Sequence, residues 1–258
     1  MLYSRLKINF ISTPISTEDF KKNFLYDNRY STYSALLKVI ESQNKKLSED
    51  IHENKIPRAF LFSNFIFPSL RGRKFNFHIY ITSSYSEVFS ALLKGFSKLD
   101  AISINNQFLV KANLEIERYD ISNIDSFTFL SPFILRDKEG NTTESQDSFT
   151  NLIKGQIKRV ADALYENNKI KSKIGDFDVI LNTSGFKKKL FKIKKNDSNV
   201  TTYRAWSATS PNETIKFEGK AKDLAKAIAL YYGIGDKTNF GFGMLGLPKG
   251  DQDAALQI

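Results

Sequence analysis

Four glycines gather in one short segment near the end of the chain, with Lys237 and Thr238 between the two pairs: Gly233-Ile-Gly-Asp-Lys-Thr-Asn-Phe-Gly-Phe-Gly243. Glycine reaches positive φ angles and lets the backbone approach a ligand closely. Successive exposed N–H groups in such a segment form a concavity that suits phosphate. We therefore expect anion contacts from Gly233, Gly235, Lys237, Thr238, Gly241 and Gly243. The alternative is a tight connection that needs glycine only for its geometry.

The segment differs from two familiar phosphate motifs. The G-x-x-x-x-G-K-[ST] order of a Walker loop is absent, and no strand precedes the segment as in a dinucleotide fingerprint. Because the chain has a formal net charge of +10, the natural ligand is a polyanion.

A run of lysines without an intervening acid is the second candidate for anion binding. It alternates with Leu190, Phe191 and Ile193, a pattern typical of a β-hairpin with an exposed face. Phosphate contacts of this kind position RNA and make its affinity salt-dependent, but they do not read sequence. The alternative is an ordinary solvated strand. The candidate residues are Lys187, Lys188, Lys189, Lys192 and Lys194.

The composition excludes several other chemistries. The chain has no cysteine and only 2 histidines, so thiolate and multi-histidine metal centres are not expected, nor is any other cofactor. No apolar run approaches the length of about 20 residues that a membrane span needs. The first residues alternate like a strand and lack the core of a signal peptide. We expect a cytoplasmic protein that binds no membrane.

The first half of the sequence predicts six elements in the order β-α-β-β-α-β. The first strand is at 3–11, and the helix after it is capped by Ser31 or Thr32 and has a second piece that ends near His52. Two strands follow at 59–68 and 74–82, joined around Arg71-Gly72-Arg73. A helix at 86–99 and a strand at 107–118 complete the set. This order is that of the ferredoxin-like fold.

The second half repeats that order. It comprises a strand at 127–135, a helix at 146–167, long strands at 177–194 and 200–218 joined at Asn196-Asp197, a helix at 221–232 and a last strand near 241–247. The prediction is therefore an α+β protein of two tandem ferredoxin-like (RRM-like) domains. The first covers residues 1–120 and the second covers residues 121–258.

The closing G-x-G-x(5)-G-x-G-M segment, the tandem order and three further segments carry a family resemblance. These segments are Asn44 to Ser63, which holds Ile51-His52-Glu53, then Phe127-Thr-Phe-Leu-Ser-Pro132, and Tyr203-Arg-Ala-Trp206. Together they make the chain resemble the CRISPR repeat-processing endoribonucleases. This is the sixth numbered Cas family, within the RAMP superfamily.

The resemblance implies a set of site residues. His52 falls on the histidine that cuts RNA without metal, and Arg58 falls near the family's catalytic lysine, with Lys55 as a neighbour able to substitute. The family's tyrosine position carries Leu37, and the candidates to compensate are Tyr33, one turn earlier, and Tyr30, a little further off. Taken alone, His52 also reads as an ordinary histidine at a helix C-terminus, where the helix dipole favours the imidazolium.

The implied reaction is attack by the RNA's own 2′-hydroxyl, which leaves a 2′,3′-cyclic phosphate and a 5′-hydroxyl. Histidine suits the proton transfers because it titrates near neutral pH, and an arginine or lysine stabilises the crowded phosphorane. The implied partners are CRISPR repeat RNA and other Cas proteins of an interference complex. The resemblance leaves monomer and homodimer open.

Two other functions stay open from the sequence. One is a non-catalytic RAMP-type subunit that only holds repeat or guide RNA, which the leucine at position 37 motivates. The other is a basic RNA-binding module unrelated to CRISPR. Phenylalanines between positions 60 and 67 are expected either to stack bases or, more commonly, to fill the core.

Overall fold

The structure is a computed structural model that describes most of the chain. The described residues are 1–16, 18–19, 28–66, 75–105, 107–137, 139–143, 145–182, 185–196, 199–210 and 212–247, with the backbone alone for 192–196, 199 and 200. The predicted turns at Arg71-Gly72-Arg73 and Asp197, and the side chains of Lys192 and Lys194, therefore lie outside the described residues.

A five-stranded antiparallel sheet forms the first unit. Its strand order is β2-β3-β1-β5-β4, with β2 at Leu61–Phe62, β3 at Asn76–Thr82, β1 at Leu2–Ser12, β5 at Gln107–Asp120 and β4 at Ala101–Ile104. Apart from the edge strand β4, which the sequence did not predict, this is the ferredoxin-like order in which the first and third strands lie at the centre.

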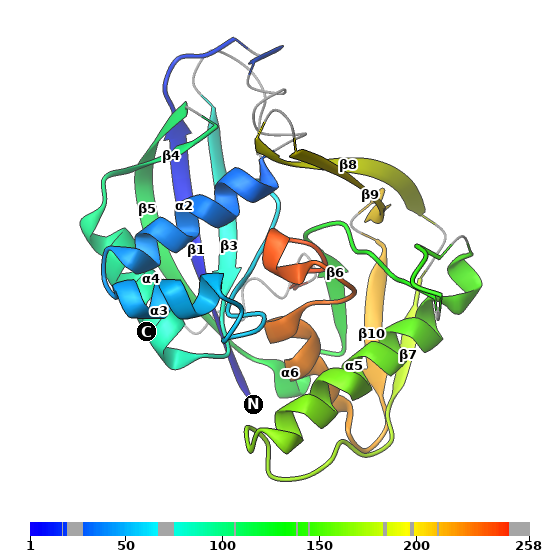
Figure 1. The fold of residues 1–258 in the computed structure, drawn as a ribbon. Helices are drawn as coiled ribbons and strands as arrows, with labels where there is room; N and C mark the ends of the chain where they lie inside the picture. Colours follow the sequence, from blue (N-terminus) through cyan, green and yellow to red (C-terminus); the bar gives the residue numbers. More distant parts are fainter. Residues whose placement is uncertain are drawn as a thin grey trace.

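Three helices cover one face of this sheet: α2 (Arg29–Glu41), α3 (Lys45–His52) and α4 (Ser86–Lys98) (Figure 1). Alternation in β1 directs Leu6, Ile8 and Phe10 into the core beneath them, where each is at most 1% exposed. Helix α2 begins at Arg29, earlier than the predicted cap at Ser31 or Thr32, and no side chain caps it.

The second unit repeats the arrangement. Its four-stranded sheet has the order β11-β6-β10-β7, with β11 at Leu245–Gly246, β6 at Ser126–Phe129, β10 at Thr214–Glu218 and β7 at Asp178–Leu181. Helices α5 (Phe149–Glu166) and α6 (Lys222–Tyr232) pack on this sheet. The prediction of two tandem ferredoxin-like folds is confirmed.

A separate hairpin of β8 (Phe186–Asn196) and β9 (Asn199–Ala208) is inserted between the second and third strands of that sheet. The sequence predicted two continuous strands here, 177–194 and 200–218, and that was wrong. Thr209 N–H donates to the Gly185 carbonyl, and the Glu213 carboxylate accepts the Ser210 N–H at 2.6 Å. These contacts close the hairpin base, so β7 and β10 form one sheet while β8 and β9 leave it.

Three other predicted strands are shorter than expected. The strand at 59–68 is reduced to Leu61–Phe62 and an isolated bridge between Ile66 and His78. The strand at 127–135 ends at Phe129, and Phe133 pairs with Trp206 of the hairpin instead. The last strand contains only Leu245–Gly246. In each case the residues beyond the end of the strand are also buried. The hydrophobic pattern of the sequence therefore continues past the strand and did not show where it ends.

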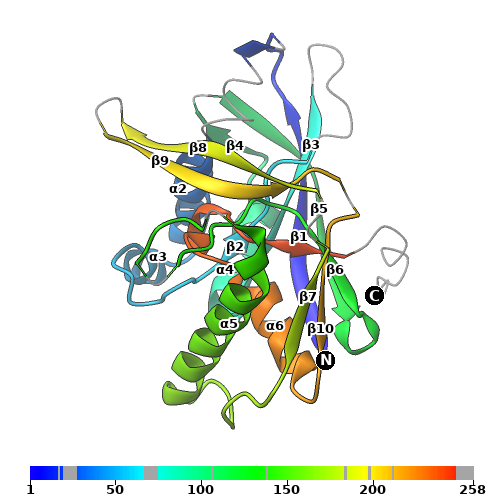
Figure 2. The ribbon, with the colours of Figure 1, turned by 90° about the vertical axis from the view of Figure 1, so that its right-hand side faces the viewer.

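Both units present their helices on the same side of the molecule, as the turned view shows (Figure 2). The units also share a core, because Tyr3 and Tyr119 of the first sheet pack among the apolar side chains of the second unit. The rings of Tyr3 and Tyr231, from β1 and α6, have centroids 5.1 Å apart. In the described parts of the chain, no helix is both long enough and apolar enough to cross a membrane.

Candidate functional site

His52 is the last residue of α3 and is exposed. The Asn44 side chain caps the start of this short helix by accepting the Leu47 N–H at 3.0 Å. Leu47 and Ile51 are buried on the first core, which turns the opposite side of the helix to solvent. The imidazole makes no hydrogen bond or ion pair with any described residue, so it is open to a ligand.

Lys55 and Arg58 lie in the turn that follows α3, in different environments. The Lys55 ammonium is exposed and pairs with Glu53 at 2.6 Å and Asp50 at 3.4 Å. Hydrogen bonds to these two carboxylates raise its pKa. Its charge is therefore already neutralised locally.

Arg58 is half-buried and reaches the second unit, where it donates to the Tyr232 carbonyl at 3.4 Å. Burial lowers the pKa of Arg58; the carboxylate of Asp236 opposes that shift and the charge of Arg159 adds to it. Of the two predicted cations, Arg58 has no carboxylate within ion-pair distance in the described chain, which leaves its charge available to an anion.

Tyr33 packs between aromatic rings of both units. Its ring centroid lies 5.5 Å from that of Phe60 and 5.2 Å from that of Phe240 in the glycine-rich segment. Burial raises the pKa of the Tyr33 phenol, so the hydroxyl stays protonated and can donate. Leu37, at the family's tyrosine position, packs on the first core.

The glycine-rich segment uses most of its N–H groups inside the protein. Gly233 donates to the Ala229 carbonyl, Gly235 to the Gln156 side chain, Gly241 to the Thr238 carbonyl and Gly243 to the Pro132 carbonyl, over 2.6 to 3.0 Å. The expectation that these four N–H groups face a phosphate is corrected: they are already engaged in hydrogen bonds, and their residues are buried.

The same four glycines are at φ angles between +73° and +84°, which other residues rarely adopt. A Cβ at Gly235 would lie 2.2 Å from the Ile134 carbonyl oxygen, and one at Gly241 would lie 2.5 Å from the Phe62 ring. Close packing therefore requires glycine here. Thr238 is only 3% exposed, whereas the Lys237 side chain is exposed to solvent.

Arg29, which no sequence motif marks, holds the glycine-rich segment against α2. It is 4% exposed and donates to the carbonyls of Phe240 and Gly241 and to the Asn64 side chain. Its guanidinium lies 4.1 Å from the centroid of the Phe242 ring. Burial lowers its pKa. A single arginine before a helix carries no sequence signal for such a role.

The hairpin lysines do not share one face. Register pairs Lys187 with Ser207 and Lys189 with Ala205, whereas Lys188 pairs with Trp206 on the opposite face. On the face that carries Lys187 and Lys189, Phe191 and Tyr203 pack on Phe242 of the glycine-rich segment. Lys188 lies 5.1 Å from the Trp206 ring, and Lys237 lies 5.9 Å from the Tyr203 ring. The two predicted RNA-binding segments thus meet in space.

A cleft of about 1210 Å³ separates the two units on the helical side. The turn after α3 and the start of α4 line one wall, and α5, α6 and Asp236 line the other. Asn54, Lys55 and Arg58 belong to the lining, so the chain directly after His52 borders the cleft. Its second wall supplies two further cations, Arg159 and Lys169.

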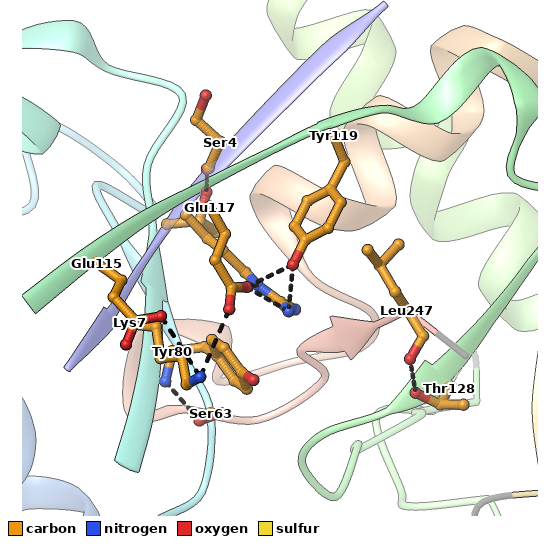
Figure 3. A network of polar contacts seen from close by, with 11 residues as sticks. Ser4, Lys7, Ser63, Tyr80, Glu115, Glu117, Tyr119, Thr128 and Leu247 are labelled. Atoms are coloured by element: carbon orange, nitrogen blue, oxygen red, sulfur yellow. Dashed lines mark hydrogen bonds and ion pairs between the residues drawn. The ribbon is translucent and has the colours of Figure 1, made fainter. Parts of the chain in front are cut away.

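The open face of the first sheet is charged, but its charges are paired (Figure 3). Arg5 is 2% exposed and bonded to Glu117 at 2.6 Å, and Lys7 lies 3.5 Å from Glu115. Phe60, Phe62 and Phe65 are buried and belong to the core, and Phe67 lies outside the described residues. Over the described part of the chain, no group of three or more His, Asp or Glu side chains is placed to hold a metal ion.

Solved structures place this architecture in a known class. A RAMP protein binding different RNA substrates is 17% identical, with a TM-score of 0.70, over 95% of this chain and 99% of the other. A CRISPR associated protein Cas6 is 19% identical, with a TM-score of 0.68, over 95% and 99%. A Cas6-related protein from Pyrococcus furiosus is 20% identical, with a TM-score of 0.67, over 95% and 98%. This chain therefore shares the fold of these three proteins.

The family follows from the sequence of the second unit. The family model described as CRISPR associated protein Cas6, C-terminal, matches residues 114–247, just over half of the chain. The protein belongs to the Cas6 family. No curated protein matches it in sequence.

Proposed function

We propose that this protein is a metal-independent endoribonuclease that cuts CRISPR precursor RNA within its repeats and releases guide RNAs. The observation that carries the proposal is the exposed His52 at the end of α3, directly before a cation-lined cleft, in a member of the Cas6 family. Its substrate is the repeat RNA, its expected location is the cytoplasm with that transcript, and other Cas proteins are expected partners.

His52 transfers protons in this mechanism. Imidazole either takes the proton of the 2′-hydroxyl or gives one to the departing 5′-oxygen, and it suits both steps because it titrates near neutral pH. Arg58 stabilises the developing phosphorane charge. The protonated Tyr33 hydroxyl is the candidate hydrogen-bond donor in place of the family's tyrosine. The products are a 2′,3′-cyclic phosphate and a 5′-hydroxyl.

The predicted lysines of the hairpin and of the glycine-rich segment bind the RNA away from the cut. Lys237 is exposed beside the hairpin, and Lys187 and Lys189 are exposed on its lysine-bearing strand. Such contacts hold phosphates without reading sequence. Lys188, at the Trp206 ring, belongs to the same strand.

The test is cleavage of repeat RNA in EDTA by the wild-type protein and by His52→Ala. The wild type is expected to cut at one position per repeat. His52→Ala is expected to lose on the order of 10²–10⁴-fold in single-turnover rate, the usual contribution of a general acid or base. His78→Gln is the matched control, because it changes the other histidine, on the open face of the first sheet. Full activity of His52→Ala would contradict the assignment.

One observation favours a second function, an RNA-binding subunit without nuclease activity. The family's tyrosine position carries Leu37, and that side chain packs on the first core. This alternative predicts that the wild-type protein binds repeat RNA and leaves it intact under all conditions in which it is folded.

A further inference from the structure

Arg58 has a backbone conformation that arginine rarely adopts. Its φ angle is +51°, in the left-handed region, where the Cβ atom crowds the following carbonyl oxygen. Among the described residues, five other than glycine have positive φ angles, and three of these are asparagines, which tolerate the region better. The other two are Arg58 and Lys237, both of which the proposed function assigns to the RNA. Backbone strain of this kind persists only where the surrounding structure holds it.

One loop, between β3 and α4, holds both neighbours of Arg58 in the chain. The Ser83 hydroxyl donates to the Ala59 carbonyl at 2.5 Å, and the Tyr85 hydroxyl donates to the Pro57 carbonyl at 3.4 Å. Ser83 is 6% exposed, so its hydrogen bond is protected from water. Its Oγ also accepts the Tyr85 N–H at 3.0 Å, which ties the two side chains to one turn. The residues before and after Arg58 are therefore fixed by the same short segment.

The side chain of Arg58 is held from the second unit. Its guanidinium donates to the carbonyl of Tyr232, the last residue of α6, at 3.4 Å. The C-terminus of a helix carries a partial negative charge, so it attracts a cation without neutralising it as a carboxylate would. The Tyr232 hydroxyl accepts from the Ser84 hydroxyl at 2.7 Å. The loop between β3 and α4 thus bonds both the backbone beside Arg58 and the helix end that receives its guanidinium.

We propose that Ser83 is a positioning residue for the cleavage reaction. Its hydroxyl keeps Arg58 in the left-handed conformation, and that conformation sets the direction in which the guanidinium leaves the backbone. The proposal rests on the proposed function, in which Arg58 is the cation that stabilises the phosphorane. Because Ser83 is buried, it acts on the reaction only through Arg58. A serine that merely stabilised its loop would leave the contribution of Arg58 unchanged.

The test is a double-mutant cycle of Ser83→Ala and Arg58→Ala, read as the single-turnover cleavage rate of repeat RNA at saturating protein. In the wild-type background, Ser83→Ala is expected to lower the rate about 10- to 100-fold, as for a misplaced catalytic group. In the Arg58→Ala background it should lower the rate less than about twofold, because no guanidinium remains to be misplaced. Binding of an uncleavable 2′-deoxy repeat RNA should change by less than about threefold, since no contact with the RNA is removed.

Thr82→Val is the matched control. It removes the neighbouring buried hydroxyl, which is 0% exposed and donates to the Ser4 carbonyl of β1 at 2.8 Å. This bond does not reach the turn that holds Arg58, so the cleavage rate should stay within about threefold of the wild type. Thermal unfolding of both variants shows whether the two losses of a buried hydrogen bond are comparable.

A second arm reads the backbone at position 58 without any cleavage. Arg58→Gly is expected to unfold about 2–4 °C above Arg58→Ala, because glycine adopts the left-handed region without strain. Equal unfolding temperatures of these two variants would overturn the proposal, since no strained conformation would then need to be held.

An equal loss of rate from Ser83→Ala in both backgrounds would also overturn the positioning role, as would an equal loss in Thr82→Val, which would indicate general damage to the fold. In either case the wild type still cuts and Arg58→Ala is still slow, so the proposed function stands. A wild-type protein that leaves the unmodified RNA intact gives a different result: it contradicts the proposed nuclease and overturns the positioning role with it.

Discussion

At the scale of single residues, the proposed cleavage needs a cation beside His52, and Lys55 and Arg58 are the two candidates. Lys55 and Arg58 are close in sequence but differ in partners, since Lys55 is bound to Glu53 and Asp50. Arg58 is half-buried, and its one hydrogen bond among the described residues goes to the Tyr232 carbonyl oxygen. A partly desolvated guanidinium interacts more strongly with a phosphorane than an exposed, paired ammonium does.

Arg58→Ala is therefore expected to lower the single-turnover cleavage rate about 10²–10³-fold, the effect of removing one oxyanion-hole donor. Lys55→Ala should cost far less, below about tenfold, because it removes a charge that is already neutralised. Thermal unfolding of both variants checks that the fold is intact. A larger loss in Lys55→Ala than in Arg58→Ala would transfer the role to the lysine.

The sequence alone singled out His52 and Arg58 as candidates only because the residues around them form a segment that resembles a family. Arg29 and Arg159 offered no such segment. A single arginine in a polar stretch looks the same whether it becomes buried, as Arg29 does, or faces a cleft, as Arg159 does. Their places depend on contacts between residues far apart in the chain, which periodicity does not predict.

At the scale of elements, the glycine-rich segment is a packing device more than a phosphate cradle. The sequence predicted its position after the last helix, but not the hydrogen bonds that occupy its glycine N–H groups. The order of the strands along the chain was predictable from the sequence, whereas the residues at which the strands end were not. Alternation runs through the break between β7 and β8, and the hydrogen bonds at the hairpin base separate the two strands.

Gly235→Ala is expected to cost roughly 2–3 kcal/mol of stability, from strain at positive φ and from the clash with the Ile134 carbonyl. Gly140→Ala is the matched control: its φ is also +84°, but nothing lies within 4 Å of an added Cβ. Its cost should be about 1 kcal/mol, from backbone strain alone. Thermal unfolding measures both. Equal stability of the two variants would contradict the packing role.

At the scale of the whole molecule, two ferredoxin-like units are joined at several places. Tyr3 packs in the second core, Arg29 binds the glycine-rich segment, and Arg58 reaches the Tyr232 carbonyl. The division between residues 120 and 121 stays a prediction, because these contacts tie the units together. They also explain how the turn after His52 and the start of the glycine-rich segment come to border one cleft.

The central claim is that the RNA supplies its own nucleophile and that His52 handles the protons. The most direct measurement replaces the 2′-hydroxyl beside the cut by hydrogen and follows cleavage and binding in EDTA. Cleavage is expected to be abolished, binding is expected to change by less than about threefold, and unmodified RNA is expected to yield a 2′,3′-cyclic phosphate. Cleavage of the 2′-deoxy RNA at the same position would contradict the claim.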